Sequence, residues 1–169
     1  SYYASFGVFP IDTFLHFDSG FRVLNGEYPI KDYWIHKGIF VDYLEAFFFF
    51  LFGVSWETHI VHSSFINGLI ALATFFVLRN LNLNKSYSLL YSLSFAILAY
   101  PVSGTPFVDH HAAFICLLGI YCFILALSGK GNIYLILTPI FFGLSFISKQ
   151  TPSAYIIIPF GLMIILYSI

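Results

Sequence analysis

The stretch that decides the fold is ETHIVHSSFINGLIALATFFVLR, which runs from Glu57 to Arg79. As an α-helix, at 1.5 Å per residue, it would be about 35 Å long. That length is enough to cross a bilayer hydrocarbon core of about 30 Å. Its charged residues stand only at the two ends, so the stretch predicts a membrane-spanning helix.

The whole chain is likewise rich in apolar residues and poor in charged ones. It has 169 residues, of which 59% are hydrophobic, 21% aromatic and 9% charged, with a net charge of -1. The mean hydropathy is +0.87. An ordinary soluble domain has about 25% charged residues, so this composition excludes a soluble globular protein, a disordered tail and a basic nucleic-acid binder. We expect an integral membrane protein whose lipid-facing surface accommodates the 22 Phe and 12 Tyr.

Other apolar stretches predict about five membrane spans in residues 57–169. Three further spans are expected at Ser86–Val102, His110–Ser128 and Asn132–Ser148, and Ala154–Ile169 is expected to be a truncated span. Residues 1–10 are expected to be the end of an earlier span, so the sequence is interpreted as one partial transmembrane domain of a longer protein.

Residues 11–56 are predicted to form a loop between spans that contains two helices. Apolar residues at helical spacing indicate a short amphipathic helix that lies on the membrane; they are Phe14, Phe17, Phe21 and Leu24, with Asp12, His16 and Ser19 on the other face. Ile39–Gly53 is too short to cross the bilayer and contains Asp42 and Glu45. Because buried charges are costly in a membrane, we expect an interfacial or re-entrant helix here. The predicted fold class is therefore an all-α polytopic transmembrane bundle with an outer-face loop.

Basic residues indicate the orientation of the bundle. Arg79, Lys85 and Lys130 are concentrated in or beside two short turns without an acidic residue, and such turns generally face the cytoplasm. Residues 1–56, 103–109 and 149–153 are then expected together on the opposite, outer face. The expected location is a bacterial inner membrane, with the site facing the periplasm.

Several polar motifs form a recognisable set, and they carry a family resemblance. They are Asp12, Gly26, Pro29, Asp32-Tyr33-Trp34, Lys37-Gly38, Leu51-Phe52-Gly53, Asp109 and Ser148-Lys149. This set resembles the outer loops of the GT-C membrane glycosyltransferases, in the branch of the protein O-mannosyltransferases and the aminoarabinose transferases of lipid A.

The resemblance implies an inverting transfer of a sugar from a polyprenyl-phosphate donor to an acceptor hydroxyl. It implies that Asp12 is the general base and that Lys37 helps to hold the donor phosphate. Asp109 is the candidate for a second acidic catalytic group or an acceptor-binding group, and Lys149 and Arg22 are further candidates for binding the donor phosphate. The acceptor would be a glycan, a lipid or a protein.

Other polar residues complete the candidate substrate site; they are His16, Asp32, His36, His111 and Gln150. Each catalytic candidate also has a structural explanation. Asp12 or Asp109 could cap a helix, either lysine could extend its ammonium group to water at the interface, and Asp18 could form a helical ion pair with Arg22. Asp32 could order its loop instead of taking part in chemistry.

The histidines and cysteines give weaker indications. His59 and His62 share a helix face, but a metal site needs three or four converging ligands, so no metal ligand is assigned and a divalent metal stays open. Hydrogen bonds near Glu57 are the simpler expectation for these two histidines. Cys116 and Cys122 lie about 240° apart around one helix and cannot pair. The alternative functions are a polytopic transporter and a non-catalytic membrane scaffold.

Overall fold

The computed structural model describes residues 10–35, 37–99 and 104–168, and within these ranges it contains seven helices and no β-strand. The all-helical prediction is therefore confirmed for the described residues. The helices are α1 (Pro10–Leu24), α2 (Phe40–Phe52), α3 (Trp56–Asn80), α4 (Lys85–Leu98), α5 (Val108–Leu127), α6 (Ile133–Ser148) and α7 (Gln150–Ser168).

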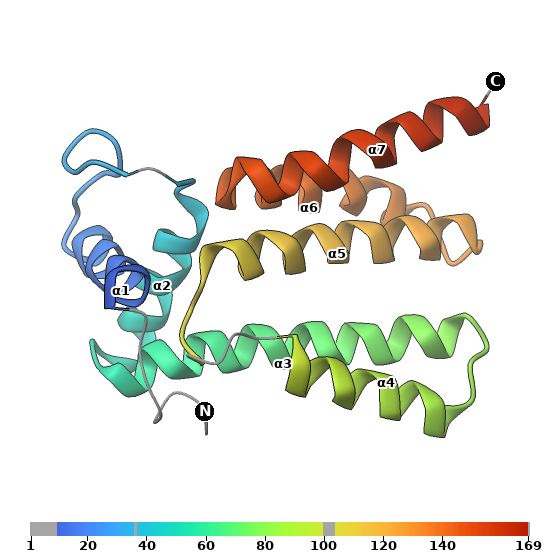
Figure 1. The fold of residues 1–169 in the computed structure, drawn as a ribbon, viewed down its shortest axis with the longest axis horizontal. Helices are drawn as coiled ribbons and strands as arrows, with labels where there is room; N and C mark the ends of the chain where they lie inside the picture. Colours follow the sequence, from blue (N-terminus) through green and yellow to red (C-terminus); the bar gives the residue numbers. More distant parts are fainter. Residues whose placement is uncertain (1–9, 36, 100–103, 169) are drawn as a thin grey trace.

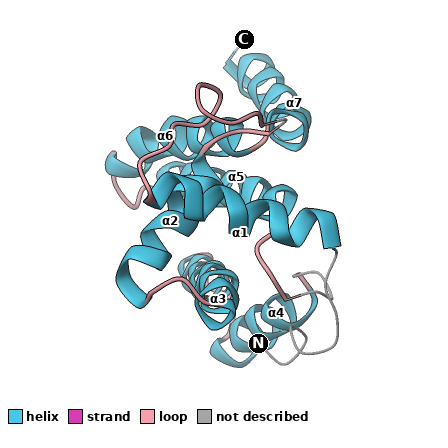
Figure 2. Cartoon of the chain, turned by 90° about the vertical axis from the view of Figure 1, so that its left-hand side faces the viewer, coloured by secondary structure: helices cyan, strands magenta, loops and turns pink. Residues whose placement is uncertain are grey.

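The helices form a bundle with a cap at one end. α3 and α4 pack together as one layer, and α5, α6 and α7 form the other, with all five running along the same direction (Figure 1). α1 and α2 pack on each other and lie across the end at which α3, α5 and α7 begin (Figures 1 and 2). We call α1, α2 and the loop between them the cap. The α3–α4 and α5–α6 turns lie at the opposite end (Figure 1).

Two helices, α3 and α5, are long and apolar enough to cross a membrane. Both correspond to predicted spans, and their ends differ from the predicted ones by one or two residues. α4 and α6 have 14 and 16 residues, which is shorter than the roughly 20 residues that a straight span needs. The structure thus supports membrane-crossing length for fewer helices than the sequence predicted.

The start of α7 differs from the prediction. Residues 149–153 were expected to connect two spans on the outer face, but α7 begins at Gln150, and Lys149 is the single non-helical residue between α6 and α7. Pro152 lies in the first turn of α7. A proline is tolerated there because the first amide groups of a helix have no carbonyl partner within it.

The cap has its polar side turned inward. Thr13, His16 and Ser19 of α1 are at most 2% exposed, whereas Phe14 and Phe21 are 50% and 46% exposed. The predicted amphipathic helix is therefore present, and His16 and Ser19 of its polar face pack against the protein, whereas Asp12 is exposed. α2 follows the predicted interfacial helix, and its carboxylates at 42 and 45 are completely buried.

Candidate functional site

An ion pair between α5 and the α6–α7 junction is the centre of the candidate site. Asp109 lies in the first turn of α5, and Lys149 is the residue that links α6 to α7. Both carboxylate oxygens of Asp109 lie 2.8 Å from Lys149 Nζ. The side chains are 38% and 29% exposed, so solvent and ligands can reach both groups.

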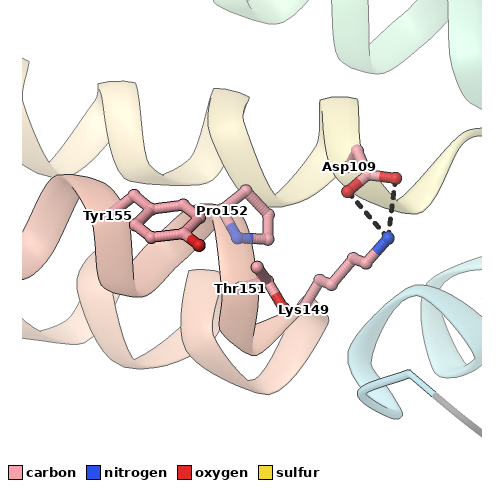
Figure 3. Close-up of a pocket in the computed structure, with 5 residues that line it drawn as sticks. All are labelled: Asp109, Lys149, Thr151, Pro152 and Tyr155. Atoms are coloured by element: carbon pink, nitrogen blue, oxygen red, sulfur yellow. Dashed lines mark hydrogen bonds and ion pairs between the residues drawn. The ribbon is translucent and has the colours of Figure 1, made fainter.

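The ion pair lines a pocket of about 330 Å³ together with Thr151, Pro152 and Tyr155 of α7. Figure 3 shows Lys149 extending from the helix junction to Asp109, with Thr151 beside it and Tyr155 one turn further along α7. Tyr155 is 74% exposed. The pocket thus combines an ammonium group, a carboxylate and two hydroxyl groups. An ammonium group can bind a phosphate, and a carboxylate can accept a proton from a hydroxyl nucleophile.

The backbone around Lys149 is fixed by several hydrogen bonds. Its N–H donates to Ser145 O at 3.0 Å, and its own carbonyl accepts from Ser153 Oγ at 2.7 Å. Gly38 N–H in the cap donates to Ser148 O at 3.0 Å. A Cβ on Gly38 would lie 1.6 Å from Ile147 O, so only glycine allows this approach. The Lys37-Gly38 and Ser148-Lys149 motifs, far apart in the sequence, therefore meet through their backbones.

Lys37 itself lies in a buried ion pair in the cap. Its Nζ donates to Asp42 Oδ1 at 2.7 Å and to His16 Nδ1, and its side chain is 1% exposed. Burial lowers the pKa of Lys37, and the Asp42 carboxylate offsets part of this effect. The positive charge of Lys37 is thus balanced by the Asp42 carboxylate inside the protein. Lys37 does not line the pocket that contains Lys149.

His16 is neutral in this arrangement because its Nδ1 accepts a hydrogen bond from Lys37. Burial lowers the pKa of His16 to about 4, which agrees with this state. Tyr33 OH lies 3.5 Å from Asp42 Oδ2, and burial, together with the charge of that carboxylate, raises the pKa of Tyr33. His16, predicted to bind substrate, therefore takes part in the internal polar contacts of the cap.

Asp12 is exposed in the first turn of α1. Because Asp12 lies within the helix, the alternative explanation that it is an N-cap does not hold. Asp109 is likewise not a cap: the N-cap of α5 is Phe107, and Asp109 pairs with Lys149.

Arg22 and Asp32 have structural partners in the cap. Arg22 donates to Asp18 at 2.7 Å, which confirms the expected helical ion pair, and to Glu27 at 3.1 Å. The guanidinium group also lies over the ring of Tyr33. Asp32 accepts from Tyr28 N–H at 2.8 Å, so it orders its own loop.

The remaining predicted site residues lie elsewhere. Gln150 is exposed at the start of α7 and does not line the described pocket. His111 is buried and faces His62 instead of Asp109. His36 falls outside the described residues.

A buried group of one carboxylate and three histidines was not predicted as a unit. Glu45 Oε1 lies 2.7 Å from His59 Nδ1, and Glu45 Oε2 forms a hydrogen bond with His62 Nδ1. His62 Nε2 lies 3.2 Å from His111 Nε2. The three-residue spacing of the α3 histidines indicated a shared face, but the expected neighbour Glu57 is exposed. The residues that the structure describes contain no group of three or more His, Cys, Asp or Glu side chains arranged to hold a metal.

The two cysteines of α5 are free and buried, as expected from their spacing.

Comparison with known proteins finds no family model, no curated protein and no solved structure that matches this chain.

Proposed function

We propose that the chain is a multi-pass membrane protein whose bundle crosses the bilayer along the direction of α3 to α7. The distribution of side chains supports this proposal. Among the described residues, more polar than hydrophobic side chains are buried, and several large hydrophobic side chains are exposed on each of α3, α4, α6 and α7. A soluble protein avoids large exposed apolar areas, whereas lipid solvates them.

We further propose that the protein transfers a sugar from a polyprenyl-phosphate donor to an acceptor hydroxyl at the capped end of the bundle. The observation that carries this proposal is the Asp109–Lys149 pair in an open pocket. The residues that line the pocket come from the first turns of α5 and α7 and from the link before α7. These helix ends lie next to the cap and not at mid-bundle (Figure 1). A substrate with a charged head group and a hydrocarbon tail would present its phosphate at this depth.

In this proposal Lys149 binds the donor phosphate and Asp109 acts on the acceptor. The acceptor oxygen attacks the sugar carbon as the bond from that carbon to the phosphate oxygen breaks. The proton of the acceptor hydroxyl passes to a carboxylate, and the departing phosphate keeps the electron pair under stabilisation by the ammonium group. Binding of the phosphate would draw Lys149 away from Asp109 and leave this carboxylate free to accept the proton. Asp12 is the alternative base, because it is an exposed carboxylate in the cap.

The test is a transfer assay on the full-length protein in lipid with a polyprenyl-phosphate sugar donor. Lys149→Ala should weaken donor binding roughly ten- to a hundredfold, because a charge-assisted contact contributes about 1.5 to 3 kcal/mol. Asp109→Asn should retain donor binding and lower turnover about 10²- to 10⁴-fold. Lys130→Ala is the matched control, since Lys130 is exposed at the opposite end of the bundle. Unchanged binding and turnover in both site variants would refute the proposal.

A further inference from the structure

The hydrogen atoms available to the buried group around Glu45 can be counted. Glu45, His59, His62 and His111 are each 0% exposed, and we call them the buried histidine cluster. Four hydrogen bonds join this cluster: two between Glu45 and the α3 histidines, one between His62 and His111, and one between His111 Nδ1 and Phe107 O at 3.0 Å.

Each of these hydrogen bonds needs one hydrogen between its two atoms. The Phe107 carbonyl can only accept, so His111 Nδ1 carries a hydrogen. A neutral imidazole carries one N–H, so three neutral histidines supply at most three hydrogens for the four bonds. His59 Nε2 is buried without a hydrogen-bond partner among the described residues, so a hydrogen placed there would satisfy none of these bonds. An ionised Glu45 supplies none.

We infer that the buried histidine cluster binds one proton more than an ionised Glu45 and three neutral imidazoles would carry. The proton can reside on Glu45, on His62 or on His111, and in each case all four hydrogen bonds are satisfied. It also brings the charge of the cluster from -1 to zero. A buried carboxylate requires such compensation, because an unpaired charge in a low-dielectric interior is costly.

The Lys37 ammonium group interacts with Glu45 through its charge, but among the described residues it forms no hydrogen bond with the cluster. Lys37 is paired with Asp42, and His16 is neutral because it accepts from Lys37. His110 of α5 lies beside the cluster in sequence, and it faces Phe107 and Phe114. Burial alone raises the pKa of Glu45, but hydrogen bonds from His59 and His62 outweigh burial and leave this pKa below its ordinary value. This direction favours an ionised Glu45.

The bound proton makes folding depend on pH in a defined direction. An unfolded chain releases protons from histidine near pH 6.5 and from glutamate near pH 4.3. The inferred proton is held by the four hydrogen bonds of the native cluster, so the folded chain carries it at neutral pH, where the unfolded chain has released it. Where the native state holds one proton more than the unfolded state, each increase of one pH unit lowers the folding constant tenfold.

Glu45→Gln is the decisive variant. The glutamine side chain has nearly the same shape, and its amide group can donate to His62 Nδ1 while its oxygen accepts from His59 Nδ1. All four hydrogen bonds then form with neutral imidazoles and no additional proton. Between pH 6.5 and pH 8, measured in detergent micelles, the folding constant of the wild-type chain should fall about tenfold per pH unit relative to that of Glu45→Gln.

His110→Gln is the control, because it removes a neighbouring histidine outside the cluster and should keep the wild-type pH dependence. Nitrogen NMR of ¹⁵N-histidine-labelled wild-type protein at pH 7, with infrared detection of a protonated carboxyl, gives a second readout that does not require any variant to fold. An imidazolium signal, or a carboxyl band that Glu45→Gln removes, is the expected result. Neutral imidazoles beside an ionised Glu45, or parallel pH profiles of the wild type and Glu45→Gln, would overturn the inference.

Discussion

At the scale of single residues, Lys37 shows how burial changes the interpretation of a charged side chain. The family resemblance assigns it to the donor phosphate, but its ammonium group already contacts Asp42 and His16 inside the cap. The resemblance singled out Lys37 by its place just before the helix that contains Asp42 and Glu45. It could not identify the partners, because the contact with His16 depends on how α1 packs on α2.

We therefore expect Lys37→Met to act mainly on stability. Removing the lysine leaves the Asp42 carboxylate buried and unpaired, which typically costs about 3–5 kcal/mol. The double variant Lys37→Met/Asp42→Leu should recover most of this loss, because both charges are then absent. Denaturant unfolding in micelles measures the effect, with Lys31→Met as the control at an exposed lysine. A Lys37→Met protein of normal stability but reduced donor affinity would instead support the phosphate role.

His16 gives a prediction for acidic pH. Its pKa is lowered to about 4 from an ordinary value of 6.5, so between these two pH values the unfolded state binds a proton that the folded state does not. Its contribution to stability is fully present above pH 6.5 and falls as the pH decreases toward 4, by up to about 3 kcal/mol.

The variant His16→Gln keeps an acceptor for Lys37 and lacks the titrating ring. Its unfolding free energy should lose this dependence between pH 6.5 and pH 4, even if the variant is less stable overall. The same acid sensitivity in the variant and in the wild type would show that another group causes it.

At the scale of elements, hydrophobic spacing was sufficient to predict helices and insufficient to predict how they meet. The apolar spacing of residues 14–24 and the length of residues 39–53 predicted α1 and α2 closely. The start of α7 was mispredicted because a proline in a first helical turn has the same sequence signature as a proline in a turn. The pairing of Glu45 with the α3 histidines is a tertiary contact, so the local sequence pointed to Glu57 instead.

The contact between Gly38 and α6 leads to a prediction at this scale. Gly38→Ala would place a methyl group on the backbone of α6, so the cap must move away and the hydrogen bond to Ser148 must lengthen. We expect a loss of about 1–3 kcal/mol in stability, as for other overpacked sites. In the transfer assay, donor affinity should fall as well, because this contact fixes the residue that precedes Lys149.

Gly143→Ala is the matched control, since a Cβ at that α6 glycine meets no atom within 4 Å. Unfolding in micelles and donor binding should both be close to the wild-type values for this control. If Gly38→Ala behaves like the control in both measurements, the approach of the cap to α6 does not position Lys149.

At the scale of the whole molecule, the proposed topology follows from which loops share an end. The α3–α4 and α5–α6 turns lie at the end opposite the cap (Figure 1), and both contain or adjoin the basic residues that indicate the cytoplasmic side. Single cysteines at Asn82 and Gly131 should react with a membrane-impermeant thiol reagent only after the inner face is opened. A cysteine at Glu27 in the cap should react in intact cells. The reverse pattern would place the proposed site on the cytoplasmic side.

The single-residue link at Lys149 restricts how this chain can change in length. Each helical residue advances the chain by about 100° around the helix axis. One residue inserted into a helix at this junction would therefore turn α7 so that a different face packs on α5 and α6. One residue inserted into the link itself would lengthen it and loosen the connection between α6 and α7. In both cases the ammonium group and the hydroxyl groups of Thr151 and Tyr155 would no longer border the same pocket. Insertions and deletions should therefore be tolerated in the α3–α4 turn and excluded between α6 and α7.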